Sequence, residues 1–401
     1  MEQPRQRRRW LPITIVLTLT VLLIGGAAYT LLDVRGRWML DEEIAQWKKI
    51  GGSDDLSDFK PIPVHDDDNA MHLYEQAFAA LPVWDEDSPE FAMDEEGVLI
   101  PLSDDIRMIV EQAQPALALL HKAAKLPECQ WPADYSAGAE AWIGMHMSYL
   151  GNTRALTRYA LPAAQVALAE GRHDKAMQLL ADCLILADHV GRNDTVLGLL
   201  VQTSIEARMF DFLEQLLRNT DVDCRALLPL LERSFLRKRL IRAMLIECAG
   251  WVDDFQSGAW KAKTHGKLPL LKYRFLARVL RVYRMRLQEA MLPMWEQATA
   301  TPYQPTEEEQ DAVNRFPVGM GVGRANTFVA RAEAYRAVFR LAVSLRAYRA
   351  EHGQYPDKLS DATVPAPIDP FTGEPMLYEL VPEGFIISVP HIDWPIEWRW
   401  K

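Results

Sequence analysis

Residues 167–187 read ALAEGRHDKAMQLLADCLILA, and this stretch indicates the fold class. Gly171 interrupts an apolar pattern, and glycine readily adopts the left-handed backbone conformation that ends a helix. After Gly171, small and apolar side chains recur at the spacing of one helix face: Ala176, Leu180, Cys183 and Ala187. The stretch therefore predicts two helices joined by a tight turn.

This helical hairpin resembles the second half of a tetratricopeptide unit, in which a small alanine five residues after the glycine lets two helices approach closely. Position 188 is Asp where that family usually has proline, and no second copy follows about 34 residues later. Stacked repeats need about three neighbours to bury their faces. We therefore expect a tetratricopeptide-like hairpin inside an irregular α-helical bundle, and not a repeat array.

Helical periodicity extends over residues 103–298 around this hairpin. Near its end, Tyr273, Leu276, Leu280, Tyr283 and Leu287 recur at spacings of three and four residues. The basic residues Arg274, Arg278 and Arg281 share a different face, which predicts an amphipathic helix with a basic flank. With 49% apolar and 25% charged residues in 401, the chain has globular composition. We expect a mainly α protein.

The N-terminus carries a membrane-anchor signal. Arg5, Arg7, Arg8 and Arg9 precede an uncharged run of 22 residues from Leu11 to Leu32. At about 1.5 Å per residue, this run matches a hydrocarbon core about 30 Å thick. The preceding basic cluster predicts a cytoplasmic N-terminus. The alternative is a cleaved signal peptide, with an apolar region Ile13–Ile24 and small residues Gly26 and Ala28 near a cleavage site.

Composition divides the chain into six expected segments. Residues 1–10 form a basic cytoplasmic tail, 11–32 a transmembrane helix, and 33–102 an acidic, proline-punctuated stalk or entry segment with one short helix over Asn69–Leu81. Residues 103–298 form the α-helical domain, 299–323 a linker or exposed loop, and 324–401 a small α+β unit.

Charge is unevenly distributed along the chain. Residues 33–111 carry 21 acidic and 6 basic side chains, a net of −15, whereas residues 225–290 carry 15 basic and 5 acidic side chains, a net of +10. The two segments could attract each other, or the basic one could face anionic lipid or an acidic partner, or both could be solvated helix faces.

The C-terminal unit begins with a long predicted helix, Ala325–Glu351, that ends at Gly353. One stripe of this helix is expected to cover the segments that follow: Phe328, Ala332, Tyr335, Phe339, Ala342 and Leu345. Tyr355-Pro356 and the Asp369–Gly373 segment predict two turns. MLYEL and FIISV then predict two antiparallel strands joined at Val381–Gly384.

This order, carried by YRAEHGQYPDKL (348–359), DPFTGEPMLY (369–378) and GFIISV (384–389), resembles the soluble head of the major pseudopilin of type II secretion systems. The whole chain also resembles bacterial single-pass membrane proteins that join a helical region to such a tail. The N-terminus lacks a prepilin-peptidase site, so the resemblance does not imply polymerisation. Ser388 is followed by a single aspartate, Asp393, so it does not imply the family's calcium loop either.

Candidate chemistry is sparse. HDDDNAMH, His65 to His72, is the densest cluster of possible metal ligands, but a run of acids before a helix is also a capping pattern. The adjacent pairs His173-Asp174 and Asp188-His189 lie on helices, where neighbouring residues point apart. No Walker A, HExxH, GxSxG or glycine-rich dinucleotide motif is present. We predict no catalytic, cofactor-binding or metal residue.

Two function classes remain open. The first is a membrane-anchored extracytoplasmic interaction or scaffold protein of the bacterial inner membrane, linked to secretion-type assemblies, whose partners are other envelope proteins and not nucleic acid. The second is an envelope enzyme whose site is assembled from distant residues. Cys129, Cys183, Cys224 and Cys248 are compatible either with one or two disulfides or with four buried thiols.

Overall fold

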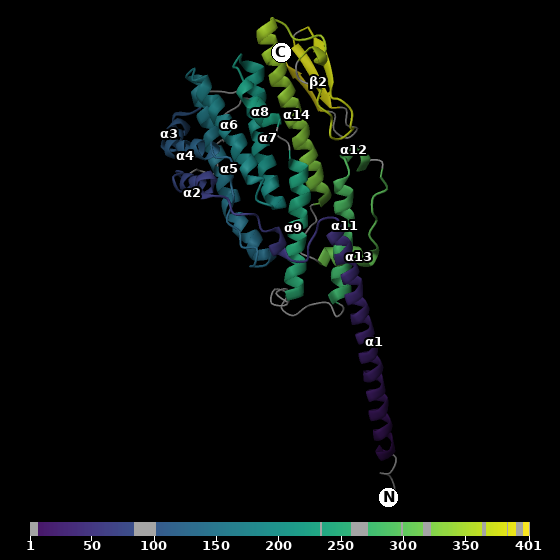
Figure 1. Cartoon of the computed structure of the whole chain (residues 1–401). Coiled ribbons are helices and arrows are strands. Elements are labelled where there is room, and N and C mark those ends of the chain that lie inside the picture. Colours follow the sequence, from purple (N-terminus) through teal and green to yellow (C-terminus); the bar gives the residue numbers. More distant parts are fainter. Residues whose placement is uncertain are drawn as a thin grey trace.

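The computed structural model describes residues 7–83, 102–232, 235–257, 272–297, 300–315, 322–362, 366–382, 384–389 and 396–400. The protein is mainly α-helical with a small C-terminal antiparallel sheet, as predicted. Helix α1 (Arg7–Lys49) projects from the body of the molecule, and the sheet lies at the opposite end (Figure 1). Within the described residues, α1 is the one helix long and apolar enough to cross a membrane.

The second half of α1 is part of the folded body. Leu40, Ile44 and Trp47 are buried against helices α9 (Leu236–Ser257) and α11 (Lys272–Met291). Residues 33–49, which fall within the expected stalk, therefore pack against the helical region.

Most helices surround one large core. They are α2 (Met71–Ala79), α3 (Asp104–Gln112), α4 (Gln114–Ala124), α5 (Ala139–Ala169), α6 (His173–Val190), α7 (Val196–Asn219) and α8 (Leu228–Glu232). Short 3-10 turns lie at Leu56–Phe59, Asp66–Asp68, Arg225–Leu227 and Leu359–Asp361. Helix α2, expected as one short helix within the acidic segment, buries Tyr74 completely in this core. The prolines at 89 and 101 fall outside the described residues.

The hairpin of α5 and α6 forms at the stretch that predicts it. Gly171 has a positive φ of 71°, and Arg172 N–H donates to the carbonyl of Ala167 at 2.8 Å, which closes the helix end. Ala176, Leu180, Cys183 and Ala187 are all buried, so the predicted apolar face of α6 is confirmed. The likeness of this hairpin to a tetratricopeptide unit stays a prediction.

The expected loop over residues 299–323 is wrong in part, because helix α13 (Glu307–Arg315) lies within it. Thr306 and Glu309 form a capping box, in which Glu309 N–H donates to the Thr306 hydroxyl at 3.3 Å and Thr306 N–H donates to the Glu309 carboxylate at 2.9 Å. The acids of this run also pair with α11, where Glu308 contacts Arg274 and Arg278. The basic flank of α11 thus stabilises α13, whose sequence is strongly acidic.

Helix α14 (Val322–His352) connects the body to the C-terminal sheet (Figure 1). Gly353, at φ 78°, ends the helix as predicted. Phe339, Ala342 and Leu345 are buried in the large core together with helices α5 to α7 and the sheet. The expected stripe is wrong at its beginning, where Phe328 is 49% exposed instead of covering the tail.

The sheet has the order β1-β2-β3, with β1 at Leu377–Val381, β2 at Gly384–Val389 and β3 at Ile396–Trp400. Both pairings are antiparallel, so β2 is central, and β3 is an additional strand that the sequence pattern does not predict. The turn before β1 forms as predicted, with the buried Asp369 carboxylate accepting from Phe371 N–H at 2.9 Å and from the Thr372 hydroxyl at 2.7 Å. This arrangement is an Asx turn.

All four cysteines are free thiols, and Cys129, Cys183 and Cys224 are buried. Burial raises the pKa of each of these thiols above its ordinary value. They therefore pack as small apolar groups.

Candidate functional site: a groove between α7 and α14

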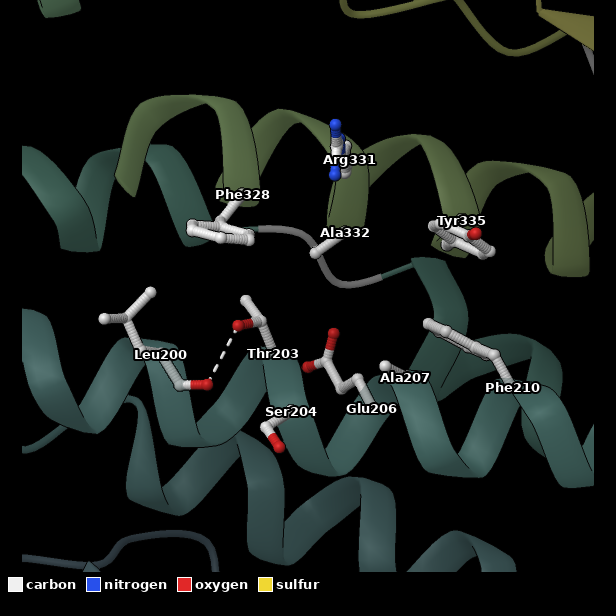
Figure 2. Close-up of a pocket in the computed structure, with 10 residues that line it drawn as sticks. All are labelled: Leu200, Thr203, Ser204, Glu206, Ala207, Phe210, Phe328, Arg331, Ala332 and Tyr335. Atoms are coloured by element: carbon white, nitrogen blue, oxygen red, sulfur yellow. Dashed lines mark hydrogen bonds between the residues drawn. The ribbon is translucent and has the colours of Figure 1, made fainter. Parts of the chain in front are cut away.

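A groove with a volume of about 440 Å³ runs between helices α7 and α14 (Figure 2). Its lining residues come from both helices: Leu200, Thr203, Ser204, Glu206, Ala207, Phe210, Phe328, Arg331, Ala332 and Tyr335. Leu200 faces Phe328 at one end and Phe210 faces Tyr335 at the other, so the two helices run in the same direction. Eleven residues of α7 span this distance, which makes the groove about 15 Å long.

The groove exists because small side chains lie between larger ones. Thr203 and Ala207 on α7 face Ala332 on α14, and none of the three is long enough to fill the space between the helices (Figure 2). At one end the rings of Phe210 and Tyr335 stack at 6.4 Å and close the space. At the other end Phe328 stays half-exposed.

A buried ion pair joins the two helices at the groove. Arg336 donates to both carboxylate oxygens of Glu206 at 2.8 and 2.9 Å, and the two side chains are only 4% and 0% exposed. Gln202 donates to the same carboxylate at 2.7 Å, and Arg336 also donates to the carbonyl of Leu230 at 3.0 Å. The Glu206 carboxylate thus has hydrogen-bond partners within the protein, and the positive charge of Arg336 balances its negative charge.

The polar contacts continue from this pair into the body. Arg239 donates to Gln202 at 3.1 Å and pairs with Asp188 at 2.7 Å, and Arg192 pairs with the second oxygen of Asp188 at 2.7 Å. Burial by itself would raise the pKa of Asp188, but the guanidinium groups of Arg239 and Arg192 outweigh it and hold the pKa below its ordinary value. This chain of contacts links helices α6, α7, α9 and α14.

The lining offers little for catalysis. The Thr203 hydroxyl donates to the carbonyl of Leu200 at 2.9 Å (Figure 2), and Glu206 is held by Arg336. A general base must be within hydrogen-bond reach of the proton that it removes, and the Glu206 carboxylate is already bonded to Arg336 and Gln202. The arrangement is suited to binding apolar surface.

His189 and His121 each lie beside a polar side chain of the fold. His189 lies 2.9 Å from the hydroxyl of Tyr74, and burial lowers the pKa of His189 to about 4, so its ring is neutral near pH 7. His121 lies 3.0 Å from the buried carboxylate of Asp182. The sequence pair Asp188-His189 does not form a dyad, because Asp188 is held by two arginines and His189 by Tyr74.

The HDDDNAMH cluster is arranged around a helix start. The ring of His65 accepts from Asp67 N–H at 3.3 Å, and the Asn69 side chain accepts from Met71 N–H at 3.2 Å at the beginning of α2. His72 lies 3.7 Å from Asp66. In the part of the chain that the structure describes, no three side chains of His, Cys, Asp or Glu gather closely enough to hold a metal ion.

The groove does not follow from the sequence pattern. Phe328, Ala332 and Tyr335 read as part of one core-facing stripe, and the partner helix α7 is more than 100 residues earlier in the chain. Arg336 is one of six arginines in α14, so the sequence alone does not distinguish it as the buried one that needs an acid as its partner.

Comparisons of this chain with family models, curated proteins and solved structures return no match.

Proposed function

We propose that this chain is a membrane-anchored interaction protein of the bacterial envelope, and that its groove between α7 and α14 binds an apolar segment of another envelope protein. The single observation that carries the proposal is the open, apolar groove itself, about 440 Å³ in volume and with Phe328 half-exposed at its mouth. Exposed aromatic groups in a concave apolar site are typical anchors of protein recognition.

The shape of the groove favours one face of a peptide helix or an extended segment over a small polar molecule. A pocket for a small polar ligand needs several convergent polar groups to orient it. Here the Glu206 carboxylate is already paired with Arg336, and the Thr203 hydroxyl is bonded to its own helix. A length of about 15 Å accommodates anchors at positions i, i+4 and i+7 of a partner helix.

The anchor is the apolar first half of α1, with the N-terminus in the cytoplasm and the body outside it. The arginines at positions 5, 7, 8 and 9 before the apolar run support this orientation. The likeness of the tail to a pseudopilin head suggests partners among components of secretion-type assemblies. In this proposal, the tail packs on the later part of α14, where Trp400 contacts Phe339, and holds the helix in place.

Photo-crosslinking in living bacteria tests the groove. Benzoylphenylalanine at position 328 should form an ultraviolet-dependent adduct with a discrete partner, because that side chain lies at the groove mouth. Benzoylphenylalanine in place of Met108 on α3, exposed but away from the groove, should not form this adduct (Figure 1).

Filling the groove with a large side chain gives a second test, which has a matched control on α4. Ala207 is exposed and lines the groove, so Ala207→Trp in the same protein should lower the adduct yield by about tenfold. Ala118→Trp, a similarly exposed change on α4, should leave the yield unchanged. Absence of an adduct from position 328, or an equal yield after Ala207→Trp, contradicts the proposal.

A further inference from the structure

The first turn of α11 lies against α1 just beyond the apolar run. Gly36 is buried there, and a Cβ atom at this position would lie 3.0 Å from the backbone nitrogen of Arg274. This close approach favours glycine, and it places Lys272, Tyr273 and Arg274 beside residue 36 of α1. Figure 1 shows the start of α11 at the end of the body from which α1 projects.

The distance along α1 sets the depth of this contact relative to a bilayer. Helix α1 is continuous from Arg7 to Lys49, and Gly36 is four residues beyond Leu32, the last residue of the apolar run. Four residues correspond to about 6 Å of helix. The headgroup layer on each side of a bilayer is about 5–7 Å thick. The first turn of α11 therefore lies at headgroup depth when the apolar run spans the hydrocarbon core.

The side chains at this depth are cationic and aromatic. Arg35 and Arg37 on α1 are exposed, and Trp38 is 65% exposed. The Arg37 guanidinium lies 4.6 Å above the ring of Tyr273, and the Lys272 ammonium lies 4.6 Å from the same ring. This combination is typical of membrane interfaces, where tryptophan, tyrosine and basic side chains anchor a helix.

Two acids face the same surface. Asp33 pairs with Arg37 at 3.1 Å, and Glu308 lies 3.6 Å from Arg274 and also contacts Arg278. Among the described residues, no carboxylate pairs with Arg35 or Lys272, so the surface keeps a net positive charge. The first N–H groups of α11 add positive partial charge at the same place.

We propose that this junction surface, formed by Arg35, Arg37, Trp38, Lys272 and Arg274, binds the headgroups of anionic phospholipids. The binding holds the body of the protein at a defined orientation on the bilayer. The inference rests on α1 crossing a membrane, but it is independent of the groove and of which side the body occupies. It predicts that the contact depends on lipid charge.

Hydrogen exchange on the full-length protein in nanodiscs tests it. The protein is placed in phosphatidylcholine alone, or in a mixture with phosphatidylglycerol, and exchange of the amides from Lys272 to Phe275 is measured. We expect exchange to slow by about fivefold in the anionic discs, the factor that corresponds to one cation near an anionic surface. Salt at about 1 M, where the Debye length is about 3 Å, should remove the difference.

Variants and a soluble anion sharpen the test. Arg35→Gln combined with Lys272→Gln should abolish the difference, whereas Lys358→Gln, an exposed cation in the C-terminal tail, should not. Inorganic phosphate added to neutral discs should not reproduce the slowing, and equal slowing by phosphate would assign the surface to a soluble ligand. Equal exchange of the wild-type protein in both lipids overturns the proposal, whatever the variants do.

Discussion

At the scale of single residues, the pair of Glu206 and Arg336 decides how α14 lies against α7. Taking two charges out of water costs several kcal/mol, and the attraction between them offsets this only when the geometry is good. The two bonds from Arg336, at 2.8 and 2.9 Å, meet that condition. Removing one partner leaves the other charge buried and unpaired.

Glu206→Gln or Arg336→Met alone should therefore lower the free energy of unfolding by about 3–5 kcal/mol. The double change Glu206→Leu with Arg336→Met should be much closer to the wild type, since it leaves no unpaired buried charge. Chemical denaturation of the full-length protein in detergent, followed by circular dichroism, measures both. Arg225→Gln, which breaks exposed pairs with Asp223 and Glu351, is the control and should change stability by about 0–1 kcal/mol. Equal effects of the buried and exposed changes would contradict this account.

The sequence could not identify this pair. Its members lie 130 positions apart, and the chain offers 55 acidic residues as partners for any buried arginine. Only the packing of α14 on α7 selects Glu206. Local features such as Gly171 and Gly353 were predictable because the physical requirement, a positive φ at a helix end, is met within a few residues.

At the scale of elements, helices were predicted more completely than their packing. The α5–α6 hairpin, the amphipathic α11 and the long α14 follow from periodicity and end signals. Helix α13 was missed because its capping box, Thr306 to Glu309, lies within a run of acids that resembles a loop. Strand β3 was not predicted because it lies beyond the pair of strands that the turns indicate.

The sheet depends on one aromatic group of β2. Phe385 is completely buried, with its ring 4.8 Å from that of Tyr355 and 6.1 Å from that of Trp400. Phe385→Ala should lower the free energy of unfolding by about 3–5 kcal/mol and make the chain after Gly353 sensitive to protease. Leu380→Ala, at the position that pairs with Phe385 across the sheet but 42% exposed, is the control and should cost about 0.5 kcal/mol or less. An unchanged protease pattern in Phe385→Ala would show that the sheet does not depend on this core.

At the scale of the whole molecule, α14 belongs to two environments. Its earlier part shares a core with α1, α9 and α11, through Ala325 and Val329, and its later part shares the large core with α7 and the sheet, through Phe339 and Leu345. The groove lies at the point where α14 passes from one core to the other. The groove thus lies where it does because α14 packs into two different cores. Local periodicity does not show that one helix contributes to two cores.

The orientation of the whole molecule is the remaining prediction. A reporter that is active only outside the cytoplasm, fused after Lys401, should be active, because the four arginines before Leu11 favour retention of the N-terminus inside. Replacing these four with glutamine should weaken that bias, since Arg35 and Arg37 then form the nearest basic cluster on the other side, and reporter activity should fall. An inactive reporter on the unaltered chain would place the body in the cytoplasm. Mass spectrometry of the mature N-terminus distinguishes an anchored chain from a cleaved one. A chain beginning near Tyr29 would lack the anchor, and the proposed contact of lipid headgroups near Gly36 would then be wrong.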